Sequence, residues 1–129
     1  MKPSPALSSA LSRTPQTLNV LLFSQPACEY CAEVREHYLG PLARARRGNV
    51  FVAEAELESP ALMSDWANRP TTQGRFAKAS GARFAPTVMF FDGSGRSVAQ
   101  PIVGLSRDFF GAYLEQRLSD AHAATVSRP

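Results

Sequence analysis

The sequence has few of the residues that build metal centres, covalent frameworks or membrane spans. Its 129 residues include only two cysteines, two histidines and one tryptophan. Because a zinc site takes four ligands, His37 and His122 would both have to join the cysteine pair, so a metal carrier is an alternative with little support. No apolar run approaches the length of about 18 residues that a membrane span needs. We therefore expect no membrane span.

The amino-terminal segment lacks the apolar core of a signal peptide. Residues 1–16 are rich in proline, serine and alanine, carry Lys2 and contain no sustained apolar run. We interpret residues 1–16 as a disordered leader or the start of a truncated chain. The length then fits a single domain over residues 17–119, followed by a disordered tail over 120–129.

The charge pattern gives little support to a nucleic-acid partner. The net charge is +3, with 14 basic and 11 acidic side chains spread along the chain. The cluster formed by Arg44, Arg46 and Arg47 falls late in a predicted helix, where cations favour the helix dipole. No basic stripe with interleaved aromatic residues accompanies it. We therefore expect no nucleic-acid partner.

Apolar patterning predicts an alternation of strands and helices. Strands are predicted over residues 18–23, 50–57, 87–91 and 97–103. Helices are predicted over 31–47 with an interruption at Gly40-Pro41, over 60–68, over 72–79 and over 106–118. Pro101 within the last strand indicates a sheet edge. This order predicts an α/β domain with a four-stranded mixed sheet and helices on both faces.

Both cysteines lie in Cys28-Glu29-Tyr30-Cys31, where a strand pattern gives way to a helical one. This spacing places them one helical turn apart, and the helix start stabilises the thiolate of Cys28. The pair is suited to thiol-disulfide exchange, in which Cys28 attacks and Cys31 resolves the mixed disulfide. So short a loop gives a cross-link only about 2 kcal/mol of stabilisation. A structural disulfide in a non-catalytic interaction module remains an alternative.

Three separated segments together resemble those of thioredoxin-fold proteins. They are the cysteine motif after a buried strand, the segment Gly81-Ala82-Arg83-Phe84-Ala85-Pro86-Thr87 before an apolar strand, and Val103-Gly104-Leu105-Ser106 before the last helix. The resemblance implies a thioredoxin-like three-layer α/β/α sandwich and a thiol-disulfide oxidoreductase. It implies no organic cofactor, because the cysteine pair is itself the redox-active group.

The resemblance also implies how substrates bind. Pro86 would form a cis peptide bond and face the dithiol, and Ala85 and Thr87 would shape the substrate groove with it. The expected partners are disulfide-containing proteins and an upstream thiol donor, and the chain is expected to be a monomer.

A narrower resemblance concerns the compartment. The Phe23-Ser24-Gln25-Pro26 opening and the insertion over residues 58–70 are similar to those of bacterial thioredoxin-related envelope proteins. This implies the bacterial periplasm, with the cytoplasm as the alternative. We expect the insertion to cover either one side of the dithiol or an edge of the sheet.

Residues around the motif adjust its chemistry. Glu29 opposes the thiolate of Cys28 by about 1 kcal/mol, which shifts the redox poise modestly towards a reductant. Tyr30 is expected at the substrate rim. Thioredoxin itself keeps a buried aspartate six residues before the first cysteine, where this sequence has Leu22. Either the chain lacks this proton acceptor, or Glu54 on the neighbouring strand supplies it, and this second hypothesis requires a raised pKa of Glu54.

Overall fold

The computed structural model describes residues 7–45 and 48–126. Its strands are β1 (Leu18–Ser24), β2 (Val50–Glu56), β3 (Leu62–Ser64), β4 (Pro70–Thr72), β5 (Thr87–Phe91) and β6 (Ser97–Val103). Its helices are α1 (Glu29–Val34), the π-helical turn η1 (Arg35–Leu39), α2 (Gly40–Ala45), α3 (Gln73–Ser80) and α4 (Phe110–Val126).

Four strands form a mixed sheet in the order β2-β1-β5-β6. The pair β1 and β2 is parallel, whereas β5 runs antiparallel to both β1 and β6. The four strands predicted from apolar patterning are therefore confirmed. Strand β6 lies at an edge, as Pro101 indicated, because proline has no N–H to give to a further strand.

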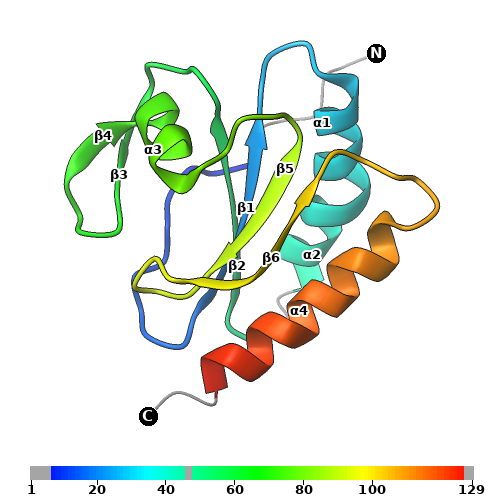
Figure 1. Cartoon of the computed structure of the whole chain (residues 1–129). Coiled ribbons are helices and arrows are strands. Elements are labelled where there is room, and N and C mark those ends of the chain that lie inside the picture. Colours follow the sequence, from blue (N-terminus) through cyan, green and yellow to red (C-terminus); the bar gives the residue numbers. More distant parts are fainter. Residues whose placement is uncertain (1–6, 46–47, 127–129) are drawn as a thin grey trace.

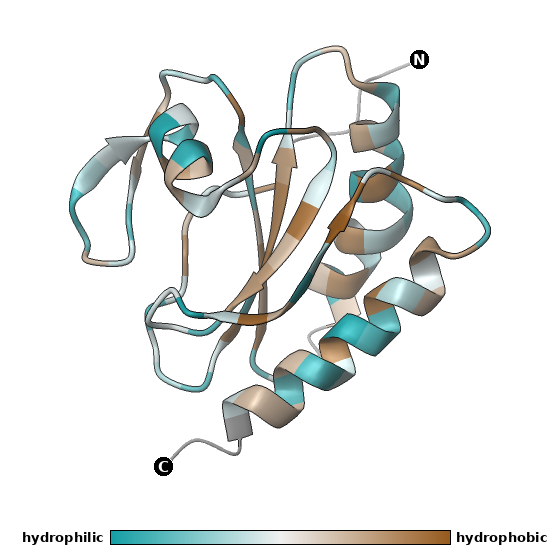
Figure 2. Ribbon diagram, in the orientation of Figure 1, coloured by the Kyte–Doolittle hydropathy of each residue, from teal (hydrophilic) through white to brown (hydrophobic). Residues whose placement is uncertain are grey.

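Helices cover both faces of this sheet, which confirms the predicted three-layer architecture (Figure 1). Successive strand side chains point to opposite faces. Leu22 thus belongs to a core shared with α1, η1, α2 and α4, and Phe23 belongs to a second core shared with α3. Figure 2 shows the resulting pattern, in which the central strands are apolar and the outward-facing helix surfaces are largely polar.

The helix that follows the cysteine motif changes its winding before Gly40-Pro41. The N–H of Gly40 donates to the carbonyl oxygen of Arg35, which is the i→i+5 spacing of η1. Pro41 has no N–H and cannot continue the regular ladder. The predicted interruption is therefore a π-helical turn that joins α1 to α2. Of the basic cluster, only Arg44 lies within the described residues.

The short helix over 72–79 is confirmed with both of its predicted ends. The hydroxyl of Thr72 accepts a 3.1 Å hydrogen bond from the N–H of Arg75 at the start of α3. Gly81 ends the helix in the left-handed region.

The predicted helix over residues 60–68 is wrong, because this segment forms a hairpin of β3 and β4. Oδ1 of Asp65 accepts hydrogen bonds from the N–H groups of Ala67 and Arg69, both at 2.9 Å. Asn68 takes a positive φ of 61°. An aspartate that bonds the backbone ahead of it competes with helix formation. The turn chemistry of Asp65 therefore outweighs the helical spacing of the apolar residues.

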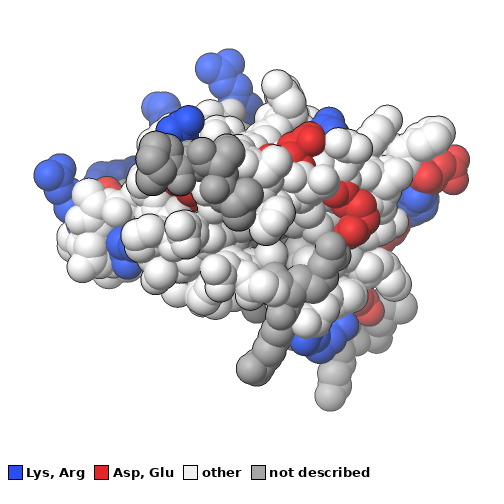
Figure 3. All heavy atoms as spheres, turned by 90° about the horizontal axis from the view of Figure 1, so that it is seen from below, with Lys and Arg blue, Asp and Glu red and all other residues white. Residues whose placement is uncertain are grey.

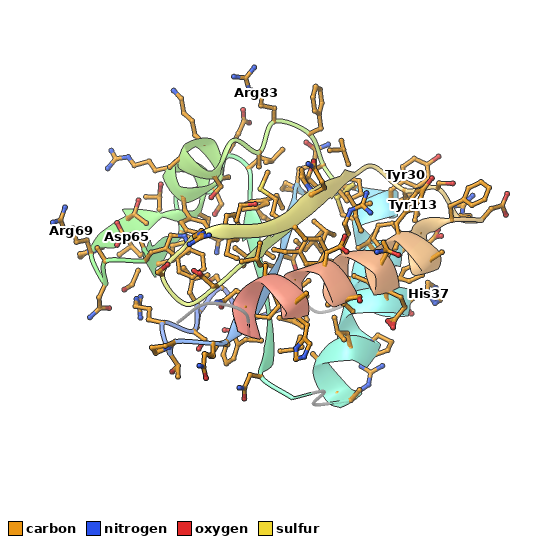
Figure 4. The ribbon with its side chains drawn as sticks, turned by 60° about the horizontal axis from the view of Figure 1, so that its bottom comes forward. Tyr30, His37, Asp65, Arg69, Arg83 and Tyr113 are labelled. Atoms are coloured by element: carbon orange, nitrogen blue, oxygen red, sulfur yellow. A yellow bond between two sulfur atoms is a disulfide. The ribbon has the colours of Figure 1, made fainter. Side chains whose placement is uncertain are left out.

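Trp66 holds this hairpin against the end of the sheet that is remote from the cysteines. Its ring lies 5.9 Å from that of Phe76 and 5.4 Å from that of Phe91. Phe91 pairs with Asn19 at the start of β1, whereas the cysteine motif follows the end of β1. In Figure 4 Asp65 and Arg69 of the hairpin lie at the opposite side of the molecule from Tyr30. The insertion therefore covers a sheet end.

Residues 7–16, for which we predicted disorder, pack around the edge of β2. Leu11 is 7% exposed within the core under α3, and Leu7 packs against the core on the opposite face. The N–H of Glu54 donates to the carbonyl oxygen of Ser8 at 2.9 Å. We call residues 7–12 the clasp. Residues 1–6 lie outside the described part of the chain.

The last helix is also longer than predicted. We predicted that this helix ends at Leu118 and that a disordered tail follows over 120–129. Helix α4 instead continues to Val126, and Ala121 and Thr125 are buried. Residues 127–129 lie outside the described residues. Within the described ranges no helix combines the length and hydropathy of a membrane span.

One face of the described surface carries charges of both signs. On the face shown in Figure 3, lysine and arginine side chains lie singly or in small groups around the margin, with uncharged and acidic residues between them.

Candidate redox site

The two cysteines lie at the start of α1 and are joined by a disulfide. Cys28 is the N-cap residue, Cys31 lies in the first turn, and their Cα atoms are 5.2 Å apart. Sγ of Cys28 accepts a 3.1 Å hydrogen bond from the N–H of Cys31. Cys28 is partly exposed, whereas Cys31 is fully buried. The first sulfur is therefore accessible and accepts a hydrogen bond from an N–H group of the first helical turn, and the second is shielded.

The register of the sheet brings two loops to the same end of the sheet as this disulfide. Strand β1 runs into the cysteine motif, and Phe23 near its end pairs with Thr87, the first residue of β5. Thr87 in turn pairs with Val103, the last residue of β6. One end of the sheet therefore holds the start of α1, the loop before β5 and the loop after β6.

The loop before β5 holds the residues for which a groove was expected. The Ala85–Pro86 peptide bond is cis, and the carbonyl oxygen of Pro86 accepts a 2.7 Å hydrogen bond from the N–H of Gly104. The hydroxyl of Thr87 donates to the carbonyl oxygen of Phe84 at 2.7 Å, and Thr87 is 2% exposed. Thr87 therefore shapes this loop from inside, while Ala85 is partly exposed and Phe84, which the sequence analysis did not select, is 67% exposed.

A cation that the sequence analysis missed lies beside the motif. The guanidinium of Arg107 sits 5.6 Å from the ring centre of Tyr30 and bonds both carboxylate oxygens of Glu33, with Nε at 2.9 Å from Oε2 and an Nη at 2.9 Å from Oε1. This hydrogen bonding is the main reason why the pKa of Glu33 lies below its ordinary value. Tyr30 itself is 54% exposed, with its ring at the rim of the site.

Glu54 is not the acid that the proton-acceptor hypothesis requires. It lies opposite Leu22 in the sheet and forms a buried ion pair with Arg35, in which Nη2 and Oε2 are 2.6 Å apart. Burial, the largest influence, raises the pKa of Glu54. Hydrogen bonds from Arg35, Ser24 and the N–H of Leu7, together with the charge of Arg35, outweigh it and hold this pKa below the ordinary value. The carboxylate is therefore stabilised in its charged form.

The remaining candidates lie apart from one another. Glu29 is exposed in the first turn of α1, His37 is exposed on η1, and His122 is exposed on α4. Within residues 7–45 and 48–126, no three side chains of histidine, cysteine, aspartate or glutamate gather in a group that could hold a metal ion.

Arg35 and Arg107 differ in how the sequence could have shown them. Arg35 follows Cys31 by four residues, which on a helix is the spacing of side chains on one face. The sequence could thus have placed Arg35 near Cys31, but only the fold shows its pairing with Glu54. Arg107 lies in a loop 77 residues after Tyr30, and no local pattern connects the two.

Comparisons with known proteins agree with this geometry. A family model described as a thioredoxin-like domain matches residues 7–117. The structure resembles oxidised thioredoxin O2 from Arabidopsis thaliana, with a TM-score of 0.55, 15% identity, and coverage of 78% of this chain and 75% of that chain. It also resembles Fasciola hepatica thioredoxin, with a TM-score of 0.56, 16% identity, and coverage of 80% and 83%. No match was found among curated proteins.

Proposed function

We propose that this chain, which belongs to the thioredoxin-like domain family, is a thiol-disulfide oxidoreductase that reduces or exchanges disulfides of partner proteins. The observation that carries the proposal is the disulfide between a partly exposed Cys28 at a helix start and a fully buried Cys31. An accessible sulfur can meet a protein substrate, and a shielded sulfur one turn away can release it.

The exchange proceeds in two displacements. In the reduced protein the thiolate of Cys28 attacks one sulfur of a substrate disulfide, forms a mixed disulfide and expels the other substrate sulfur as a thiolate. Cys31 then loses its proton, attacks Sγ of Cys28 and expels the second substrate sulfur. Two electrons pass to the substrate, and the product is the Cys28–Cys31 disulfide seen in the structure. A dithiol donor would return the protein to its reduced form.

The substrate would lie along the loop before β5. Ala85 is small and partly exposed, so it offers backbone groups to an extended chain, while Tyr30 and Phe84 offer exposed aromatic surface. Contacts of this kind select an unfolded or extended segment with apolar side chains more than a particular sequence. The exposed charge of Glu29 beside Cys28 supports a role as reductant or exchange protein.

For the compartment we propose the bacterial periplasm, on the resemblance of the motif and the 58–70 insertion to envelope proteins. Disulfide exchange between proteins is common there. Fractionation of cells that express the complete gene would test this, and recovery of the protein with cytoplasmic markers would contradict it.

The function is tested with a model protein disulfide and three forms of the chain. Wild-type protein should accelerate its reduction by a dithiol, and Cys28→Ser should abolish that acceleration. Cys31→Ser should instead accumulate a mixed disulfide that mass spectrometry detects, because attack is retained and resolution is lost. Circular dichroism establishes that each variant is folded.

A structural disulfide predicts a different result. Wild-type protein would then show no exchange, and its reduction potential would lie far below about −300 mV. Either the absence of exchange in folded protein or full activity of Cys28→Ser would contradict the proposed function.

A further inference from the structure

Glu54 accepts four hydrogen bonds, and they use both of its oxygens. Oε1 accepts from the N–H of Leu7 at 3.0 Å and from Nε of Arg35 at 2.8 Å. Oε2 accepts from Nη2 of Arg35 at 2.6 Å and from the hydroxyl of Ser24 at 2.5 Å. A carboxylate has about four acceptor positions. A proton that arrived from a thiol would therefore have to displace one of these donors.

The basic half of this ion pair, Arg35, lies on the helix that carries the buried sulfur, and the acidic half, Glu54, lies on β2. Arg35 follows Cys31 by four residues, and its N–H donates to the carbonyl oxygen of Cys31, so the two residues share one helix face. The side chains of Arg35 and Glu54 are 13% and 3% exposed. Because solvent screens buried charges little, each charge acts on its surroundings unless the other cancels it.

We propose that Arg35 is a masked cation next to Cys31 and that Glu54 is its mask. The two charges cancel at the buried sulfur, and the proton that Cys31 releases during resolution goes to solvent and not to Glu54. Both are positioning residues, because they act through Cys31. This inference deepens the proposed function, on which its consequence for turnover rests, whereas the acidity of Cys31 can be measured without any substrate.

Removal of Glu54 and removal of Arg35 should change the acidity of the Cys31 thiol in opposite directions. With Glu54→Gln the guanidinium is no longer cancelled and favours the thiolate of Cys31. With Arg35→Gln the carboxylate is no longer cancelled and disfavours the thiolate. The other charged groups are Glu56 on β2, whose charge acts on Arg35, Glu29 and Glu33 on the helix of Cys31, and Arg107, which pairs with Glu33. They remain in the Glu54 and Arg35 variants and contribute equally to those titrations, and only the control described below replaces Glu33.

The first measurement is the titration of Cys31 in the Cys28→Ser background, followed by the ultraviolet absorbance of the thiolate. Adding Glu54→Gln should lower the pKa of Cys31 by about one unit, and adding Arg35→Gln should raise it by a similar amount. Adding both should return it close to the background value. Unchanged values in the folded single variants would overturn the proposal.

The matched control is Glu33→Gln, which replaces an acid on α1 and uncovers a different arginine, Arg107. Glu33 lies two residues after Cys31, and its carboxylate is also held by both arms of a guanidinium, that of Arg107, whose side chain is 67% exposed. Solvent screens this pair, so its removal should move the pKa of Cys31 much less than Glu54→Gln does. Equal shifts would show that masking is not specific to Arg35 and Glu54, and would overturn the proposal.

The second measurement separates the mask from a proton acceptor. A mixed disulfide between Cys28 and a coloured aromatic thiol is prepared in acid, the pH is raised, and release of the coloured thiol by Cys31 is followed. A mask predicts that Glu54→Gln moves the rate profile to lower pH by about one unit. A proton acceptor predicts slower release at every pH, which would overturn the proposal.

Two further outcomes complete the test. If Glu54→Gln does not fold, the titrations of Arg35→Gln and of the double variant still decide, because the first must raise the pKa and the second must restore it. If the wild-type chain shows no activity on protein disulfides but these shifts occur, the proposed function fails and the masked cation stands.

Discussion

The backbone N–H of Gly104 donates a 2.7 Å hydrogen bond to the carbonyl oxygen of Pro86. This bond joins the loop after β6 to the loop before β5. Three residues further on, Arg107 stacks over Tyr30 between the two cysteines. Three segments that lie far apart in the sequence are thus connected around one disulfide, and the geometry of the redox site depends on all of them.

Two glycines with similar backbone angles should respond differently to substitution. Gly104 has a φ of +79°, and a Cβ added there meets no atom within 4 Å. Gly104→Ala should therefore destabilise the fold by about 1 kcal/mol, the cost of the left-handed backbone alone. Gly95 has a φ of +91°, and its Cβ would lie 2.5 Å from the ring of Trp66. Gly95→Ala should therefore lower the free energy of unfolding in urea clearly more than Gly104→Ala does. Equal losses of unfolding free energy in the two variants would contradict this.

The Arg35–Glu54 pair should make stability depend on pH in the acid range. Because the folded pKa of Glu54 is lowered, its contribution is complete above the ordinary carboxyl value of about 4.3 and is lost as the pH falls through the folded pKa. The free energy of unfolding, measured from neutral pH downwards, should therefore decrease once the pH is below the ordinary carboxyl pKa. The double variant Arg35→Met/Glu54→Leu, which removes both charges, should show a shallower fall.

The control for this prediction is Glu33→Gln, because Glu33 also has a lowered pKa but pairs with an exposed arginine. Screening by solvent makes such pairs contribute little. The acid dependence of this variant should stay close to that of the wild type. A larger change of the acid dependence in Glu33→Gln than in the double variant would show that the buried pair is not the main source of that dependence.

The sequence predicted the sheet well because each strand carries its own signal. Strands 87–91 and 97–103 agree with β5 and β6 to the residue, because the turn that begins with Asp92-Gly93 marks the end of the first and precedes the second. The cysteine pair was equally clear, because its chemistry depends on a local spacing. Thr72 and Gly81 showed the ends of α3 in the same way.

The errors arose where distant contacts decide the structure. The hairpin of β3 and β4 combines the local turn at Asp65 with the distant contact of Trp66 and Phe91. The clasp depends on Leu11 entering a core built by other elements. Neither contact leaves a periodic pattern. The state of Glu54 could not be predicted because its pKa depends on Arg35 and Ser24, which the fold alone brings to it.

Arg107 should affect substrate binding more than the chemistry of the cysteines. Arg107→Gln removes the contact that holds the ring of Tyr30, so KM for a protein disulfide should rise several-fold while kcat stays near that of the wild type. Arg69→Gln removes the same charge at the far side of the molecule (Figure 4) and should change neither constant. A fall in kcat alone for Arg107→Gln would place Arg107 in the chemical step instead.

The clasp should contribute to stability through Leu11. Its side chain is 7% exposed in the core under α3, so Leu11→Ala should lower the unfolding free energy by about 2 to 4 kcal/mol. Leu62→Ala is the matched control, because Leu62 is 78% exposed and the same change there should fall within about 0.5 kcal/mol of the wild type. A disordered leader, by contrast, predicts equal and negligible losses for both variants. Denaturant unfolding of the two proteins side by side therefore determines whether residues 7–12 belong to the folded domain.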